Sequence, residues 1–325
     1  MKAAVVGDKG FGILDIDVPK PKSTEILVRV RACGLNRADI MIASGMAHGR
    51  ESGPGAVVGI EFAGEVVEVG SETEGVKPGD RVMCSGSGGW AEYAVADWGR
   101  AATIPGNNMN WAQAATLPIA LQTMHNALVT AGGMKAGETV MIQGASSGVG
   151  LMGMQIAREM GAKLVIGSST NPDRRAKLTD YGADLAVDSR DDGWVRQVLD
   201  ATDGRGVDLI VDQISGYAAN QNLAATAILG RIVNVGRLGG FSGDFNFDLH
   251  ALRRITYIGV TFRTRSIEEV RLIVKQMRAD LWDMVEAGKL TIPIDSEYSL
   301  DDAPAAVEHM RANQHFGKII LNLDD

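Results

Sequence analysis

A turn of small residues carries the clearest chemical signal in this 325-residue chain. Residues 144–150 read Gly-Ala-Ser-Ser-Gly-Val-Gly, between a strand-like segment at 140–142 and an amphipathic helical segment that starts at Leu151. Backbone N–H groups at such a helix start can hold a pyrophosphate, and small side chains let the phosphates approach. The glycine spacing differs from GxGxxG, so a tight turn without a ligand is the alternative. The setting nevertheless predicts a dinucleotide site, with contacts from Ser146, Ser147, Gly148 and Val149.

The end of the next strand-like segment, 164–166, bears on which dinucleotide binds. Proteins that prefer NAD usually carry Asp or Glu there to bond the ribose hydroxyls. This chain has Ser168 and Thr170 instead, followed by Arg174, Arg175 and Lys177. Hydroxyls and cations suit a 2′-phosphate, so we predict NADPH, held by Ser168, Thr170 and Arg174. The competing interpretation is that the basic residues only form the solvated face of a helix.

Two kinds of element must position these residues. The first third of the chain is β-rich, and most of its strands lie too close together in the sequence for helical crossovers, which predicts an antiparallel, barrel-like domain. These strands are expected at 26–31, 62–70, 81–83 and 91–95. From about residue 111, helices alternate with strands, which is typical of βαβ units in a doubly wound parallel sheet of the Rossmann type. These strands are expected at 140–142, 164–166, 185–187, 207–211, 232–235 and 256–260.

The remaining segments complete this α/β organisation. A long helix is expected from Ser266 to Ala287, followed by a short strand, a helix opened by Asp301 and Asp302, and a last strand at 318–321. The acidic start and the proline in the first turn are typical of a helix N-terminus. We expect this tail to pack with the first domain.

Composition excludes several classes of function. The net charge of −8 argues against a nucleic-acid or membrane-surface partner, because both demand a basic face. The sequence shows neither a signal-peptide pattern nor an apolar run long enough to span a bilayer. Two cysteines, Cys33 and Cys84, cannot build a disulfide framework, so a cytoplasmic protein with a small-molecule substrate is expected.

With these features described, the chain resembles the zinc-independent, zeta-crystallin-like quinone oxidoreductases of the medium-chain dehydrogenase/reductase superfamily. The resemblance covers essentially the whole length. Its marks are ACGLNRAD at 32–39, GIEFAG at 59–64, GDRV at 79–82, GWAEY at 89–93, TLP at 116–118 and the turn at 144–150.

The resemblance implies a domain organisation and a set of site residues. A GroES-like catalytic domain would comprise residues 1–122, completed by 289–325, and a Rossmann NADPH-binding domain would comprise 123–288. Active sites in this superfamily lie in the cleft between the two domains. Asn36 and Thr123 match residues beside the nicotinamide and the substrate, and Arg174 matches a lysine that contacts the 2′-phosphate. Further cofactor contacts are expected at Ser189, which stands where the family often has a tyrosine, and at Ile214, Gly236, Val260 and Phe262.

Each of these side chains also has a purely structural interpretation. Asn36 could be a turn residue that bonds local backbone. The hydroxyl of Thr123 could bond back to a carbonyl one helical turn earlier. His48, in the loop 45–55 that would border the substrate, could simply be solvated.

The same resemblance predicts that the protein holds no metal. Alcohol dehydrogenases of the superfamily bind a catalytic zinc with Cys, His and Cys, and the matching residues here are Asn36, Ile60 and Ile119. A catalytic zinc needs three protein ligands, and an isoleucine cannot be one. Without a Lewis acid, a conjugated acceptor is the better substrate, because it spreads the arriving charge onto an oxygen that neutral donors can stabilise.

We therefore expect an NADPH-dependent enzyme that transfers hydride to a quinone or an α,β-unsaturated carbonyl. The alternatives are an enzyme acting on an alcohol or an acyl-thioester enone, and an NADPH-binding protein with a structural or sensing role. An exposed, apolar edge strand at 256–260 predicts a homodimer, and the resemblance implies pairing at that edge.

Overall fold

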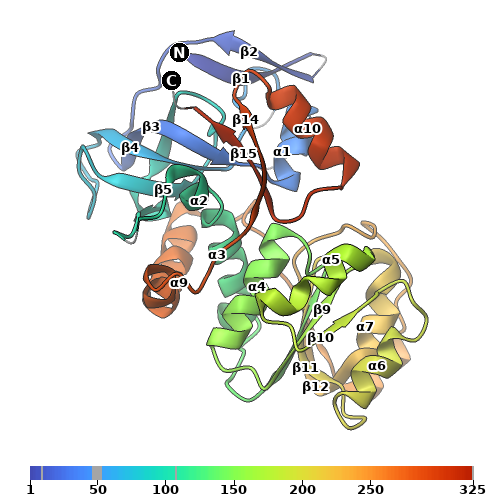
Figure 1. Ribbon diagram of the computed structural model, residues 1–325. Helices are drawn as coiled ribbons and strands as arrows, with labels where there is room; N and C mark the ends of the chain where they lie inside the picture. Colours follow the sequence, from blue (N-terminus) through green and yellow to red (C-terminus); the bar gives the residue numbers. More distant parts are fainter. Residues whose placement is uncertain (9, 46–52, 107, 324–325) are drawn as a thin grey trace. The chain divides into compact units, whose positions relative to one another are not determined.

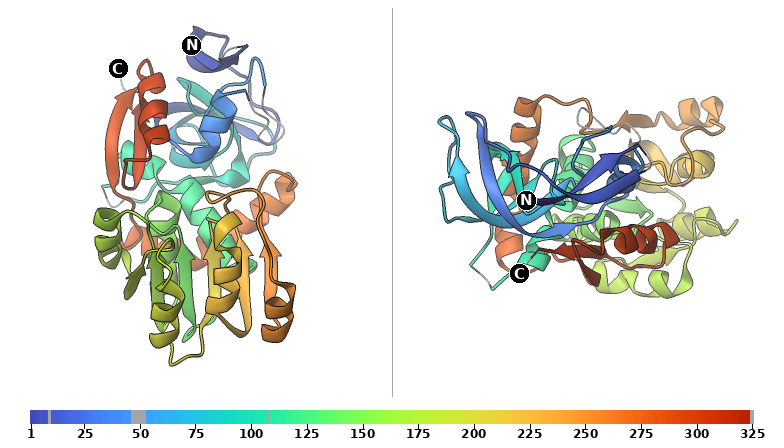
Figure 2. Two further views of the ribbon diagram at one scale, coloured as in Figure 1. Left: turned by 90° about the vertical axis from the view of Figure 1, so that its right-hand side faces the viewer. Right: turned by 90° about the horizontal axis from the view of Figure 1, so that it is seen from above.

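The computed structural model describes residues 1–8, 10–45, 53–106 and 108–323. The chain divides into two compact units, one made of Met1–Ile119 with Phe262–Asp325 and the other of Ala120–Thr261. Each unit has its own sheet (Figures 1 and 2). No helix of the described residues is long and apolar enough to cross a membrane.

The first unit is built on a sheet of seven strands in the order β14-β15-β3-β4-β5-β7, with β6 paired to β3. All of its pairings are antiparallel except β14 with β15. The sheet strands are β3 (Glu25–Gly34), β4 (Glu61–Val69), β5 (Arg81–Ser85), β6 (Tyr93–Asp97), β7 (Ala101–Thr103), β14 (Ile294–Ser299) and β15 (Lys318–Asn322). A separate hairpin consists of β1 (Lys2–Gly7) and β2 (Gly10–Asp15). The tail of the chain therefore joins the β-rich domain through β15, as predicted.

The helices of the first unit are α1 (Arg37–Ala43), α2 (Trp111–Ala115), α9 (Ile267–Glu286) and α10 (Ala303–Ala312), with a 3₁₀ turn η1 (Trp98–Arg100). The sheet encloses a core that includes the fully buried Phe62 and Trp90. The helix α3 (Pro118–His125) crosses from the first unit into the second and ends in a π-helical turn, η2 (Asn126–Thr130).

The second unit is a parallel sheet of six strands in the order β10-β9-β8-β11-β12-β13. Its strands are β8 (Thr139–Gln143), β9 (Leu164–Ser168), β10 (Leu185–Val187), β11 (Val207–Asp212), β12 (Thr226–Asn234) and β13 (Thr256–Gly259). The central strand β8 is buried along its whole length, as expected for a sheet covered on both faces. This confirms the predicted α/β fold of the second domain.

The helices that cover this sheet are α4 (Gly148–Glu159), α5 (Pro172–Ala176), α6 (Trp194–Asp200), α7 (Ala219–Ala225) and α8 (Phe247–Arg253). Two 3₁₀ turns, η3 (Leu178–Tyr181) and η4 (Gly216–Ala218), complete the unit. The helices α4 and α5 lie on one face of the sheet, while α6 and α7 lie on the other (Figure 1). Right-handed crossovers require this change of face, because the strand order reverses direction at β8.

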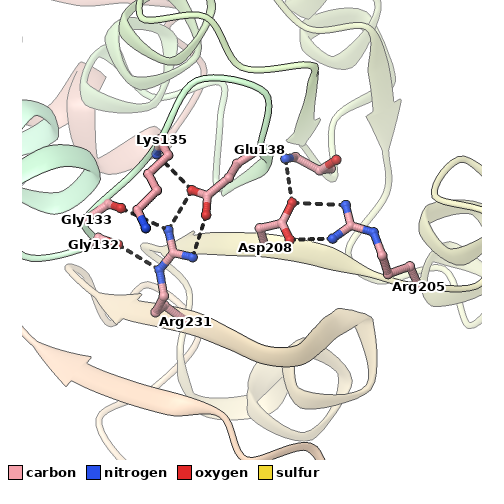
Figure 3. A network of polar contacts seen from close by, with 8 residues as sticks. Gly132, Gly133, Lys135, Glu138, Arg205, Asp208 and Arg231 are labelled. Atoms are coloured by element: carbon pink, nitrogen blue, oxygen red, sulfur yellow. Dashed lines mark hydrogen bonds and ion pairs between the residues drawn. The ribbon is translucent and has the colours of Figure 1, made fainter.

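An ion-pair network holds the amino ends of three strands in register (Figure 3). The guanidinium of Arg231, on β12, forms a two-pronged pair with Glu138 and also donates to the carbonyl of Gly132. Next to it, Asp208 on β11 accepts from the backbone N–H of Thr139 at 2.8 Å and pairs with Arg205. These charges lie at the edge of the sheet opposite the predicted cofactor residues, which leaves the carboxyl edge for function.

The long helix α9 departs from the predicted boundary. The interpretation 123–288 placed it in the second domain, but the second unit ends at Thr261 and α9 belongs to the first. Arg271 on α9 makes a two-pronged ion pair with the buried carboxylate of Asp97, at 2.6 and 2.8 Å. A Cβ on Gly99 would lie 2.4 Å from the Arg271 side chain, so the helix packs directly on η1.

Candidate functional site

The predicted cofactor residues of the second unit gather at one edge of its parallel sheet. Each lies at or just after the carboxyl end of a strand, where ligands bind in open α/β sheets. Residues 146–149 follow β8, Ser168 is the last residue of β9, Thr170 follows β9, Ser189 follows β10, Ile214 follows β11, Gly236 follows β12 and Val260 follows β13. Phe262 is the exception, because it is the first residue of the first unit's second segment.

The turn after β8 has the properties that a phosphate site requires. Gly144 has a left-handed φ of 71°, and a Cβ on Gly150 would lie 2.7 Å from the backbone of the turn. The Ser147 side chain caps α4 by accepting from the N–H of Gly150 at 3.1 Å. The backbone N–H groups of Ser146, Gly148 and Val149 have no hydrogen-bond partner within the described residues. Unpaired N–H groups at a helix start suit an anion.

A series of hydrogen bonds between buried polar side chains supports this turn. Ser168 donates to Gln143 at 2.6 Å, Gln143 donates to Asn222 at 2.7 Å, and Asn222 donates to Asp212 at 3.0 Å. Asp212 also accepts from the backbone N–H groups of Ile214 and Ser215, which fixes the turn after β11. Burial raises the pKa of the Asp212 carboxyl, and these three donors oppose that rise.

This series of hydrogen bonds also engages Ser168, for which the sequence predicts a contact to the 2′-phosphate. The residue is fully buried, and its hydroxyl gives its proton to Gln143 and accepts from the N–H of Gly144 at 3.0 Å. A hydroxyl has one proton to donate, so Ser168 has none for a 2′-phosphate in this structure. Its contribution to the site is to hold Gly144 in place.

Ile214 and Gly236 lie where two turns meet. The Ile214 side chain packs so closely that a Cβ on Gly144 would lie 3.1 Å from its Cδ1. A Cβ on Gly236 would lie 2.6 Å from the carbonyl oxygen of Gln213, so the two turns touch through their backbones. Val260 continues from β13 and donates its N–H to Asn234 at 3.1 Å.

The residues after β9 and β10 form a hydroxyl- and arginine-rich surface. Thr170 is exposed, and Ser169 donates to Ser146 at 3.0 Å. Arg175 pairs with Asp188 at 3.0 Å and also donates to the carbonyl of Ser169. Arg174, near the start of α5, is half-buried rather than freely solvated.

In the first unit, Asn36 belongs to a buried polar cluster that sequence reasoning missed. Its Nδ2 donates to Glu61 at 2.8 Å and to the carbonyl of Gly34 at 3.3 Å, while its Oδ1 accepts from Lys318 at 2.8 Å. A cation on one side and a carboxylate on the other leave only one orientation for the amide. Asn36 is 8% exposed, and both of its N–H groups are engaged with protein acceptors.

Glu61 and Lys318 form an ion pair that is closed to solvent, with side-chain exposures of 0% and 3%. Glu61 also accepts from the backbone N–H of Ile119 at 2.9 Å, and Lys318 donates to the carbonyl of Leu35 at 3.3 Å. Burial raises the pKa of the Glu61 carboxyl, against the opposing effect of Lys318. Gly34 permits the approach, because a Cβ there would lie 2.5 Å from Glu61 Oε1.

Asp39 completes this cluster on α1. Its Oδ2 accepts from the backbone N–H of Asn36 at 2.7 Å, whereas its Oδ1 is buried without a hydrogen-bond partner in the described part of the chain. Burial, with the nearby charge of Glu61, raises the pKa of the Asp39 carboxyl to about 7. Asp39 is therefore a carboxyl of this cluster whose charge is expected to change near neutral pH.

Thr123, on α3, has a hydroxyl that is not bonded back to its helix. Neither a backbone carbonyl nor another polar group of the described residues pairs with it. Two nearby threonines differ: Thr116 donates to Gln113 at 2.7 Å and Thr130 to Asn126 at 3.2 Å. Thr123 is thus the one of these three whose hydroxyl is available to a ligand.

Two further sets of residues complete the comparison with the sequence. His48 and most of the loop 45–55 lie outside the described residues. At the positions matching zinc ligands, Ile60 and Ile119 are partly buried apolar side chains, and Asn36 is held as described. Within 1–8, 10–45, 53–106 and 108–323, no three His, Cys, Asp or Glu side chains are placed to hold a metal ion.

Comparison with known proteins agrees with the fold of the two units. Residues 22–106 match the alcohol dehydrogenase GroES-like domain, and residues 148–278 match the zinc-binding dehydrogenase family. Human quinone oxidoreductase is 31% identical over 312 residues, covering 95% of this chain and 92% of that protein. Erythronolide synthase EryA2 of Saccharopolyspora erythraea is 33% identical over 315 residues, but the chain spans only 8% of that synthase.

Solved structures show the same fold along the whole chain. A mycobacterial quinone oxidoreductase superposes with a TM-score of 0.87 at 26% identity, and one from Pseudomonas syringae with 0.86 at 26%. Each comparison covers 99% of both chains. The chain belongs to the medium-chain dehydrogenase/reductase superfamily of oxidoreductases, among its quinone oxidoreductase-like members.

Proposed function

We propose that this protein is an NADPH-dependent reductase of conjugated carbonyl acceptors, quinones or α,β-unsaturated carbonyls, and that it works without zinc. The observation that carries the proposal is the set of unpaired N–H groups of Ser146, Gly148 and Val149 at the start of α4. They fit the pyrophosphate of a dinucleotide. The superfamily relationship supports the same cofactor.

The preference for NADPH rests on the end of β9. No carboxylate stands there to bond ribose hydroxyls, and the exposed Thr170 is followed by the half-buried Arg174. Other cofactor contacts are proposed from Ser147, Ser189, Ile214, Gly236, Val260 and Phe262. When bound, NADPH supplies the hydride, while the protein positions the reactants and stabilises charge.

Two residues are proposed to act on the acceptor. Thr123 has an available hydroxyl that can donate to the oxygen on which charge develops. Asn36 is held rigid by Glu61 and Lys318. Its Nδ2 donates two hydrogen bonds, and the longer one, 3.3 Å to the carbonyl of Gly34, is the one that a bond to the acceptor oxygen can replace. Both donors are neutral, which suits a delocalised charge.

The proposed independence from zinc rests on residue chemistry. Ile60 and Ile119 cannot ligate a metal, so the three protein ligands of a catalytic zinc are not assembled from the matching positions. A purified protein that holds one zinc per chain and loses activity in chelator would contradict this.

A second acceptor class, an enone carried as a thioester, is favoured by the match to segments of polyketide synthases from Mycobacterium tuberculosis and Saccharopolyspora erythraea. Consumption of NADPH should be measured with a simple quinone, a free enone and an enoyl thioester. Turnover of the first two supports the proposal, and turnover of the thioester alone favours the second class. Tight NADPH binding without any turnover would favour a structural or sensing role.

We also propose a cytoplasmic homodimer. The strand β13 is the last of its sheet, and exposed apolar side chains lie on it and on neighbouring elements. These side chains are Ile228, Leu229, Phe247, Leu252 and Tyr257. An apolar sheet edge invites pairing with a second copy. Light scattering that gives a monomer at micromolar concentration would contradict the dimer. The cytoplasm is proposed because the cysteines, Cys33 and Cys84, are free thiols.

A further inference from the structure

Tyr217, on η4, is held in a defined position at the carboxyl edge of the second unit's sheet. Its ring packs against Gly239, where a Cβ would lie 2.7 Å from the Tyr217 Cε1. The residue is 36% exposed, so the ring is anchored but reachable from solvent. An aromatic residue with a fixed ring and an open hydroxyl is a typical ligand contact.

Arg190 stacks on this ring, with its guanidinium carbon 3.7 Å from the ring centroid. The backbone N–H of Arg190 donates to Asp188 Oδ1 at 2.9 Å, while the other oxygen of Asp188 pairs with Arg175. Asp188 is thus occupied by Arg175, and within the described residues no carboxylate pairs with the Arg190 guanidinium. The stack therefore presents a positive charge without a protein counter-ion.

Ser189 brings a second hydroxyl to the same place. Its Oγ lies 3.5 Å from the Tyr217 hydroxyl, and the residue is 2% exposed. Paired hydroxyls normally approach to about 2.7–2.8 Å, so this contact is weak and leaves both groups able to bond a third partner. Two such hydroxyls next to an unpaired guanidinium form a set of donors that suits a phosphate monoester.

We infer that Tyr217 and Arg190, together with Ser189, bind the adenosine 2′-phosphate of the dinucleotide and set the preference for NADPH. The inference rests on the proposed function and extends it, because it names residues that lie outside the segment after β9. Tyr217 donates its hydroxyl to the phosphate, and Arg190 supplies the charge. The long sequence separation between Ser189 and Tyr217, 28 positions, explains why the sequence did not reveal the pair.

The test compares adenosine 2′,5′-bisphosphate with adenosine 5′-monophosphate, which differ only in the 2′-phosphate. Calorimetric titrations of the full-length wild type, Tyr217→Phe and Arg190→Gln give dissociation constants for both probes. The phenylalanine keeps the ring that packs on Gly239. A matched control is Arg196→Gln, which removes one positive charge from an exposed arginine on α6 that pairs with Asp200.

A bond to a charged phosphate predicts that each variant binds the bisphosphate about tenfold more weakly. Binding of the monophosphate should stay within about twofold, and Arg196→Gln should match the wild type. Unchanged bisphosphate affinity, or an equal loss for both probes, would overturn the inference. Wild-type protein that binds neither NADPH nor the bisphosphate would instead refute the proposed function.

Discussion

Lys318 donates to Oδ1 of Asn36 at 2.8 Å, across 282 positions of sequence and within a buried cluster. The last strand of the first unit, β15, therefore orients a side chain that lies near the start of the chain. Because Lys318 can only donate and Glu61 accepts, the amide of Asn36 has one stable orientation. A rigid amide suits a hydrogen-bond donor in an active site, because the amide does not have to reorient when charge develops on the acceptor.

Removing Lys318 should destabilise the first unit strongly. Lys318→Met leaves the buried Glu61 without its partner, which costs about 3–5 kcal/mol in comparable sites. The double variant Lys318→Met/Glu61→Gln should recover at least half of that loss, because no unpaired charge remains. Urea denaturation measures the free energy of unfolding of the single and the double variant. A double variant as unstable as the single one would show that packing, not charge, dominates.

The pH dependence of stability should reveal the buried Asp39. Its pKa of about 7 lies above the ordinary value of an aspartate, so between about pH 4 and 7 the folded protein keeps a proton that the unfolded chain has lost. The contribution of Asp39 to the free energy of unfolding is therefore full at low pH and is lost as the pH rises to about 7. Asp39→Asn should gain stability relative to wild type across that window and reach a plateau above it. A constant difference from pH 4 to 8 would contradict the buried proton.

Ser168→Ala should act on both cofactors alike. The change leaves Gln143 Oε1 and the N–H of Gly144 unsatisfied, at a cost of about 1–3 kcal/mol in stability. NADPH and NADH should weaken by the same factor, because the turn at Gly144 serves both. Fluorescence titration with each cofactor checks this, and a loss confined to NADPH would restore Ser168 as a phosphate contact.

Arg174→Ala should separate the two cofactors. A charge-assisted contact to phosphate contributes roughly 1.5–3 kcal/mol, so NADPH binding should weaken at least about tenfold while NADH hardly changes. Lys163→Ala is the matched control, because Lys163 is an exposed cation directly before β9, at the end of the strand away from the predicted cofactor residues. Equal losses for both cofactors would make Arg174 a structural residue.

Local patterns predicted the positions of nearly all strands of both sheets. The strands of the second unit could be predicted because each is an apolar run bounded by a turn. The cofactor residues stay a prediction, made because they follow those runs. The placement of α9 could not be predicted in this way. Its apolar stripe indicates burial but not the partner, and the partner is set by the ion pair of Arg271 with Asp97, 174 positions away.

The candidate site shows the same limit. Asn36 and Thr123 stood out as residues that match a family motif, but their hydrogen-bond states depend on distant partners. Asn36 is engaged by Glu61 and Lys318, and Ser168 by Gln143, whereas Thr123 is available. Sequence identifies residue types, and only the packed structure shows which donors are already used.

The most direct test of the account uses NADPH that carries deuterium at both hydrogen positions of the nicotinamide C4, with an α,β-unsaturated ketone as acceptor and chelator present. Mass spectrometry of the reduced ketone should find deuterium on the β-carbon with wild-type protein. The rate should fall in Asn36→Ala by less than the 10²–10³ typical of losing one oxyanion donor, with NADPH affinity unchanged. Product without deuterium, or no product unless zinc is added, would contradict metal-independent hydride transfer to a conjugated acceptor.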